Sequence, residues 1–258
     1  MIGALHAEWS KLRTLRSTYV ILAATLALGL GVSVLGASST AAHWDTLPAA
    51  DRAAFDPIAQ SFEGFQYGQL VLVLLGVLVI GAEYGTGEIR STLAATPRRW
   101  AVYAAKAIVL ATLTLTISMI SAFAAFLLCQ QALAGKNLDV GLGAPHALRS
   151  VLVAGLYMTV VTMVGFGLAA FLRSTAAAST AAFGLIFLAW PAARAVEGIS
   201  PLPNHLVLLN AAKVLVSTHP PTGPHADRLP SPAMAALDLV LYLAAFLTLG
   251  LWRVTRDP

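Results

Sequence analysis

Residues 81–106 read GAEYGTGEIRSTLAATPRRWAVYAAK, and this stretch interrupts a chain that is otherwise largely apolar. It holds six charged residues and three glycines, and a long apolar run lies on each side of it. So much charge between two apolar runs indicates a connection that leaves an apolar environment. The composition of the whole chain shows which environment that is.

The chain has the composition of an integral membrane protein. Of its 258 residues, 58% are hydrophobic and only 11% are charged, and the mean hydropathy is +0.77. A soluble domain carries about 25% charged residues. A helix crosses a hydrocarbon core of about 30 Å with about 20 residues, and the apolar runs of this chain have about that length.

Six apolar runs are long enough to span a membrane. They lie near residues 18–37, 67–83, 102–128, 150–172, 175–192 and 233–253. Each is apolar on every face for longer than the roughly 10 alternating residues of a transmembrane strand, and a continuous helix satisfies its own backbone in lipid. The first run exceeds the roughly 7 to 15 residues of a signal-peptide core, so we interpret it as a retained span. The predicted fold is an all-α integral membrane protein with six transmembrane helices.

Basic residues divide unevenly between the two sides of this arrangement. The connections on the N-terminal side hold ten of the 16 lysines and arginines but only four of the 12 acids. That side therefore carries a net charge of +6 and the other side −2. The positive-inside rule predicts that both termini are cytoplasmic. Because topology accounts for the basic excess, the charge gives no reason to expect nucleic-acid binding.

The N-terminal segment has a helical pattern of its own. Ile2, Leu5, Trp9, Leu12 and Leu15 recur every three or four residues and would form one apolar stripe. Basic residues lie beside this stripe, which favours a helix lying in the inner membrane interface. We therefore divide the chain into an interfacial helix, residues 1–17, and one transmembrane domain, residues 18–258. The alternative is an ordinary charged N-terminus.

The outer segment at residues 193–232 contains seven prolines. Between them, HLVLLNAAKVLV at residues 205–216 is apolar but too short to span, so it suits a re-entrant or interfacial segment. The fifth run is also short and ends at Trp190 and Pro191, where the chain is expected to turn back. In the first outer loop, residues 51–60 are expected to hold a short helix.

The connection at residues 84–100 is far longer than topology requires, because residues 172–175 join two other spans with one arginine and a turn. We expect a short helix at 87–95, followed by Thr96 as a cap and Pro97 in the first turn of the next helix. Mixed charges around a small apolar face suit docking to a soluble partner. The alternative is a positive-inside anchor without a partner.

Ionisable groups are rare within the predicted spans. Lys106 and Asp238 lie near span ends, where their side chains are expected to reach the interface. Without acids or histidines at depth, the chain lacks the groups of a proton-coupled transporter or an intramembrane hydrolase. The histidines outside the spans show no metal-ligand spacing. No catalytic, cofactor-binding or metal site is predicted on this chain. The Gly81-x-x-x-Gly85 and Gly165-Phe166-Gly167 spacings would allow close helix contacts, within one chain or between two.

Two stretches also carry a resemblance. ALHAEWSKLRTLRSTYVIL at residues 4–22 and GAEYGTGEIRSTLAATPRRWAVYAAKAIV at residues 81–109 resemble the ABC-2 type permeases, the transmembrane subunits of bacterial ATP-binding cassette exporters. Members of that family carry similar "EW.KLR..RS" and "EY..GT.R.TLA..PRR" motifs. The resemblance extends over all six spans, although its specific motifs cover only about 45 residues.

The resemblance implies that the N-terminal stripe is an elbow helix and that residues 84–100 form a coupling segment seated on an ATPase subunit. The elbow residues that match the motif are Glu8, Trp9, Lys11, Leu12 and Arg13. The coupling residues are Glu83, Tyr84, Gly87, Glu88, Ile89, Arg90, Leu93, Pro97, Arg98 and Arg99, with Thr92 and Ala94 also matching. Glu88 departs from the family, whose members often have threonine there, and this leaves open which ATPase the chain pairs with.

The resemblance also implies the partners. Two copies of a P-loop ATPase and a second permease chain, identical or sister, are expected in a bacterial inner membrane. ATP and magnesium would bind the ATPase, because this sequence has no GxxxxGK[ST] motif: its only Gly-Lys pair, Gly135 and Lys136, is followed by Asn137. The predicted function is an export permease without enzymatic activity of its own. The alternative is a membrane anchor that tethers a soluble complex without transport.

Overall fold

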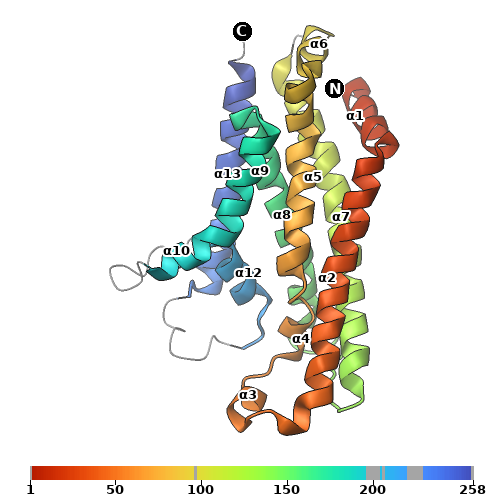
Figure 1. The fold of residues 1–258 in the computed structure, drawn as a ribbon, viewed down its shortest axis with the longest axis vertical. Coiled ribbons are helices and arrows are strands. Elements are labelled where there is room, and N and C mark those ends of the chain that lie inside the picture. The colour runs from red at the N-terminus through yellow and green to blue at the C-terminus, as the bar shows by residue number, and fades with distance from the viewer. Residues whose placement is uncertain (1, 96–97, 196–203, 205–206, 220–228, 257–258) are drawn as a thin grey trace.

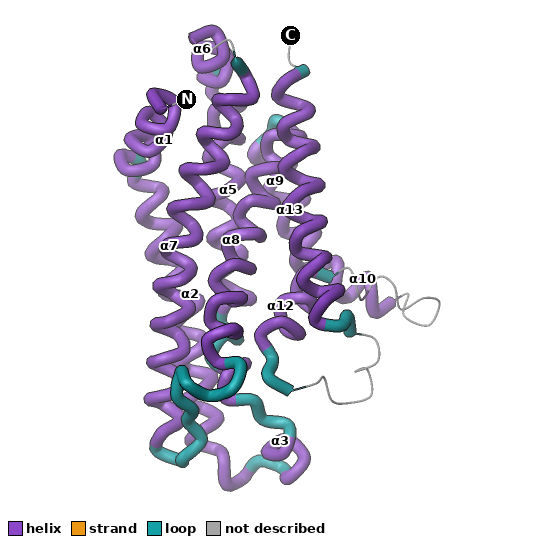
Figure 2. The backbone as a smooth tube through the Cα atoms, turned by 180° about the vertical axis from the view of Figure 1, so that it is seen from behind, coloured by secondary structure: helices purple, strands orange, loops and turns teal. Residues whose placement is uncertain are grey.

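A computed structural model describes residues 2–95, 98–195, 204, 207–219 and 229–256 of the chain, and these form a bundle of long helices without a strand (Figures 1 and 2). Six helices are long and apolar enough to cross a membrane, as the sequence predicts. They are α2 (Arg16–His43), α5 (Phe65–Thr86), α7 (Arg99–Ala134), α8 (Ala147–Leu172), the fifth span from α9 (Thr175–Phe183) to α10 (Ala189–Ala195), and α13 (Pro232–Thr255).

Shorter helices lie at the two ends of this bundle. At one end are α1 (Ile2–Thr14) and α6 (Glu88–Ala95), together with the last turn of α13 (Figure 1). Toward the other end lie a 3₁₀ turn (Trp44–Thr46), α3 (Ala49–Ala53), α4 (Pro57–Gln60) and α12 (Leu208–Val216). The chain thus begins and ends on the side that carries α6, as an even number of crossings requires.

Helix α8 is the core of the bundle and packs against α5, α7 and α13. In its most apolar stretch 78% of the residues are buried, against 17% for α13. The helices approach closely because glycines lie at these contacts. A Cβ at Gly76 of α5 would overlap the backbone of Thr162 on α8, and one at Gly167 would overlap the backbone of Phe246 on α13. These glycines pack helices within one chain.

The two glycines of the Gly81-x-x-x-Gly85 spacing have different surroundings. A Cβ at Gly81 would lie 3.0 Å from the Thr175 hydroxyl of α9, whereas no atom of the described residues lies within 4 Å of one at Gly85. Among the described residues, Gly81 marks a close helix contact and Gly85 does not.

Helix α7 is longer than expected. It runs for 36 residues, about 54 Å at 1.5 Å per residue, which exceeds the roughly 30 Å of a hydrocarbon core. The sequence placed its start at Pro97 and its end at Leu128, and the helix instead continues to Ala134. The expected cap and first turn, residues 96–97, lie outside the described part of the chain.

The fifth span does not end at Trp190 and Pro191 but continues as α10 to Ala195. The preceding residues, Gly184–Leu188, form a π-helical segment. Proline lacks an N–H and crowds the carbonyl one turn earlier, and a wider turn relieves that crowding. The helix thus continues past this proline, and the turn back of the chain stays a prediction, because residues 196–203 lie outside the described part of the chain.

The short segments at the far end differ in part from expectation. Residues 51–60 form parts of two helices, because Asp56 caps α4 by accepting hydrogen bonds from the Ile58 and Ala59 amides, both at 3.0 Å. The apolar stretch at 205–216 contains α12, which packs against α8 and α13. Its re-entrant placement stays a prediction.

Candidate functional site

Helix α6 is presented at one end of the bundle by a break in the chain after α5. Gly87 ends α5 in the left-handed conformation, with φ of 76°. Glycine adopts this conformation without strain, which makes it the usual residue after a helix end. Helix α6 therefore begins at Glu88, close to the predicted start at 87. The predicted helix is therefore confirmed.

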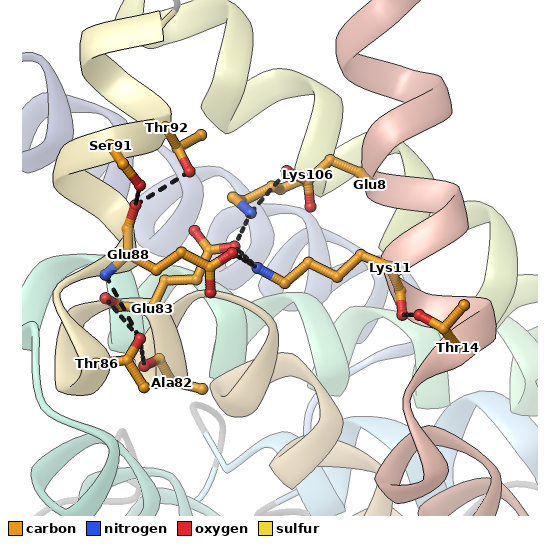
Figure 3. Close-up of polar contacts among 10 residues, drawn as sticks. All are labelled: Glu8, Lys11, Thr14, Ala82, Glu83, Thr86, Glu88, Ser91, Thr92 and Lys106. Carbon is orange, nitrogen blue, oxygen red and sulfur yellow. Dashed lines mark hydrogen bonds and ion pairs between the residues drawn. The ribbon is translucent and has the colours of Figure 1, made fainter.

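A cluster of five charged side chains lies where α6 meets the bundle (Figure 3). At its centre, the Lys106 ammonium of α7 lies 2.7 Å from Glu8 Oε1 on α1 and 2.5 Å from Glu83 Oε1 on α5. The side chain of Lys106 is 0% exposed and that of Glu83 is 3% exposed. One buried ammonium thus joins three helices.

Lys11 extends the cluster to α6. Its ammonium lies 2.5 Å from Glu83 Oε1 and 2.7 Å from Glu88 Oε1 (Figure 3). Partial burial alone would lower the pKa of Lys11, but the hydrogen bonds and charges of Glu83 and Glu88 outweigh it and raise the pKa above 10.5. The hydrogen bond from Lys11 lowers the pKa of Glu88 below 4.5. The contact between Lys11 and Glu88 is therefore ionic at neutral pH.

We call Glu8, Lys11, Glu83, Glu88 and Lys106 the charge cluster. Three carboxylates face two ammonium groups, and both ammonium groups approach the same oxygen of Glu83. The second oxygen, Glu83 Oε2, is buried and has no hydrogen-bond partner among the described residues. Buried charges are stable only when paired, and removing one partner leaves the others uncompensated. The ion pairs that link α1, α5, α6 and α7 therefore depend on one another.

Lys106 does not reach the interface as its place near a span end suggested. It is fully buried because Glu8 and Glu83 supply carboxylates beside it, and pairing makes burial tolerable. Sequence reasoning missed this residue as part of a site. The available signal was the lysine itself, since an ionisable residue within a span marks a functional-site candidate with a partner nearby.

The elbow residues divide between two faces of α1. Glu8 and Leu12 are buried against the bundle, and Lys11 reaches the charge cluster. Trp9 is 39% exposed, and Arg13 is exposed as well. Helix α1 packs against α7 (Figure 2). The predicted helix is confirmed, whereas its position in the membrane interface stays a prediction.

The coupling residues divide into buried and surface positions. Glu83 and Ile89 are buried and Tyr84 is half-buried, while Gly87, Glu88 and Arg98 are exposed and Arg99 is partly exposed. The side chains of Arg90 and Leu93, and all of Pro97, lie outside the described residues. A partner could therefore reach Glu88 and Arg98 directly, whereas Glu83 acts from within the bundle.

Tyr84 links α5 to the other side of the bundle. The Arg173 guanidinium lies 5.9 Å from the centre of the Tyr84 ring and donates a hydrogen bond to the Arg253 carbonyl at 3.1 Å. Arg173 is held in the left-handed conformation, φ 56°, in the connection between α8 and α9. The short connection thus also ties α5 to α13.

The geometry of the charge cluster favours a mechanical role over a role in covalent catalysis. The charged groups of the cluster are paired with one another and mostly buried. A displacement of α1 would strain contacts to α5, α6 and α7 together, because Lys11 pairs with Glu83 and Glu88 and Glu8 pairs with Lys106. The arrangement is a junction of charged side chains between a protruding helix and the spans.

The fold and this junction define a multi-pass membrane protein with a helix projecting from one end of its bundle. Residues 4–189, most of the chain, match the family described as ABC-2 family transporter protein. The chain therefore belongs to this family, which makes it a transport subunit and implies association with an ATP-binding partner. A comparison with curated proteins found no match.

Proposed function

We propose that the chain is the permease subunit of an ATP-binding cassette exporter, in which α6 is the coupling helix. The observation that carries the proposal is the charge cluster, which joins α1, α5 and α7 through Lys106 and reaches α6 through the Lys11–Glu88 pair, in a chain of the ABC-2 transporter family. In this proposal, a partner that pushes α6 acts on α1 through Lys11, and through α1 on α5 and α7. In this proposal α1 is the elbow helix at the membrane interface.

The assembly we propose has two permease chains, identical or sister, and two P-loop ATPase subunits. ATP and Mg²⁺ bind the ATPase subunits, and this chain holds no cofactor. The end of the bundle with α1 and α6 faces the cytoplasm of a bacterium, in accord with the excess of basic residues on that side. Closure of the ATPase pair then tilts the spans and opens a path outward.

Co-purification tests the docking part of the proposal. The tagged chain is expressed with its genomic neighbours, extracted in mild detergent, and its partners are identified with their stoichiometry by mass spectrometry. Arg98→Glu reverses an exposed charge beside α6, and Arg52→Glu reverses an exposed charge on α3 at the other end. We expect Arg98→Glu to reduce ATPase recovery and Arg52→Glu to leave it unchanged. Equal recovery with both variants would exclude docking at Arg98.

A second measurement separates an exporter from a membrane anchor. The single cysteine, Cys129, is fully buried, so a spin label on Leu241→Cys, an exposed site of α13, would be the reactive position. We expect the label-to-label distance between two copies to change when the complex is trapped with ATP and vanadate. An anchor that binds the ATPase without transport would leave that distance unchanged.

A further inference from the structure

A cavity of about 580 Å³ lies on the part of the bundle remote from α6. Its walls come from residues 54–66, which include α4 and the start of α5, and from α8 and α12 (Figure 1). Ligand cavities in proteins have volumes of about 300 to 1,000 Å³. The cavity is therefore large enough for a small organic molecule.

The inner wall of the cavity is apolar. Phe62, Phe65, Ala154 and Val216 line it and are each less than 10% exposed. Tyr157 also lines it, but its hydroxyl donates a hydrogen bond to Gln69 Oε1 at 2.5 Å and is therefore already satisfied. A ligand would meet aromatic and aliphatic surface here, which favours an apolar body.

Three charged side chains line the cavity, and they differ in how many hydrogen bonds they already make within the protein. Asp56 is occupied, because its carboxylate accepts hydrogen bonds from the amides of α4 and from Thr218, whose amide lies at 2.7 Å and hydroxyl at 2.9 Å. Glu63 accepts one hydrogen bond, from Gln60 at 2.9 Å. Lys213, on α12, also lines the cavity.

Glu63 and Lys213 do not pair with each other. Both are exposed, and no ion pair within the described part of the chain includes either of them. The lining thus combines the Glu63 carboxylate, from the segment before α5, and the Lys213 ammonium, from α12, with buried apolar side chains. A ligand with only one charge would meet a like charge in this lining, which disfavours it.

We propose that this cavity binds a single-chain zwitterionic amphipath. Its cationic group lies at Glu63, its anionic group at Lys213, and its apolar chain among Phe62, Phe65 and Val216. Binding at this site needs no contact between α6 and an ATPase, so this proposal and the proposed export function fail separately.

Three probes with the same short chain test the charge pattern: hexylphosphocholine, hexyltrimethylammonium and hexyl sulfate. Binding to the full-length protein in a neutral maltoside detergent is measured by calorimetry. We expect the wild type to bind the zwitterionic probe at least about threefold more tightly than either singly charged probe, the size of one partly exposed charge contact.

Two charge-removing variants and two matched controls complete the test. Glu63→Gln should shift the preference toward hexyl sulfate, and Lys213→Met should shift it toward hexyltrimethylammonium. Asp51→Asn and Arg52→Met remove exposed charges of α3 that do not line the cavity, and both should bind like the wild type. Opposite shifts in preference cannot arise from a common loss of folding.

The proposal is overturned if the wild type does not bind hexylphosphocholine or binds all three probes equally, because the charges would then play no part. It is also overturned if a singly charged probe binds best, or if the α3 controls change the preference as much as the cavity variants do.

Discussion

The two ends of the bundle hold their elements together in different ways. At the α6 end, five charged side chains form one cluster, with Lys106 fully buried between two carboxylates. At the far end, α4 and α12 are joined by a single carboxylate, Asp56, whose partners are neutral amides and hydroxyls. Gln130 adds neutral hydrogen bonds to the Pro57 carbonyl and the Ser61 hydroxyl.

The two ends should therefore respond differently when a single contact is lost. When one member of a buried ion pair is lost, the remaining charge is destabilising because neither a partner nor water compensates it. Neutral hydrogen bonds can be exchanged for water one at a time at lower cost. The contacts among α1, α5 and α7 at the α6 end therefore depend on one another, while the far end leaves Glu63 and Lys213 available around a cavity.

The largest effect should come from removing the centre of the charge cluster. Lys106→Met leaves the buried Glu8 without an ammonium and leaves Glu83 with only the partly exposed Lys11, and we expect a loss of about 3 to 5 kcal/mol in the free energy of unfolding. Unfolding in a denaturing detergent titration measures it. Lys106→Met combined with Glu83→Gln should recover part of the loss. A single variant as stable as the wild type would show that the cluster does not join the helices.

The next effect lies between the two ends, where α5 meets α8. Gly76→Ala would force its Cβ into the backbone of Thr162, and overpacking of this kind costs about 1 to 3 kcal/mol. Gly85→Ala is the matched control on the same helix, since no atom of the described residues lies within 4 Å of its Cβ. The same unfolding titration compares them. Equal stability of the two variants would contradict the close α5–α8 contact.

At the far end, Asp56→Asn should cost about 1.5 kcal/mol, the worth of hydrogen bonds to one charged group. Burial alone would raise the pKa of Asp56, but the hydrogen bonds from Thr218 and from the start of α4 lower it below 3.8. Because the folded pKa is lowered, this stability is present above pH 3.8 and is lost as the pH falls through the folded value. The stability difference between wild type and variant should therefore shrink only in strong acid. A difference that already shrinks near neutral pH would contradict this account.

The smallest effect should come from the exposed arm of the cluster, Lys11 and Glu88. Their side chains are 31% and 52% exposed, so a double-mutant cycle with Lys11→Met and Glu88→Gln should give about 0.5 kcal/mol. The contribution should be present between about pH 4.5 and 10.5, lost in acid as Glu88 protonates and lost in base above 10.5 as Lys11 deprotonates. A coupling as large as the loss in Lys106→Met would show that this arm is not screened by solvent.

Much of the fold was predictable because membrane helices depend on local sequence. A run of about 20 apolar residues can satisfy its backbone in lipid only as a helix, and all six predicted spans are present. Helix α6 was predictable from the glycine and charge pattern around Gly87. The ends of the helices were less predictable, since α7 continues past Leu128 and α10 continues past Pro191.

The candidate site was predictable only in part. Glu8 and Lys11 were singled out from their motif as residues of an elbow helix, and Glu83 and Glu88 as coupling residues that meet a partner. Nothing in the sequence showed that they meet one another, because they lie on three elements and up to 80 residues apart (residues 8–88). Lys106 was interpreted as a side chain that reaches the interface, since its carboxylate partners are distant in the sequence.

The sequence by itself determined that this chain lies in a membrane, crosses it six times and presents a charged connection after its second span. Those properties follow from the local balance between apolar surface and backbone hydrogen bonding. Only the tertiary structure decided that Lys106 is buried between Glu8 and Glu83, and that Glu63 and Lys213 face one cavity unpaired. Pairing of charges depends on which helices pack side by side, and that packing is set by contacts between residues far apart in the chain.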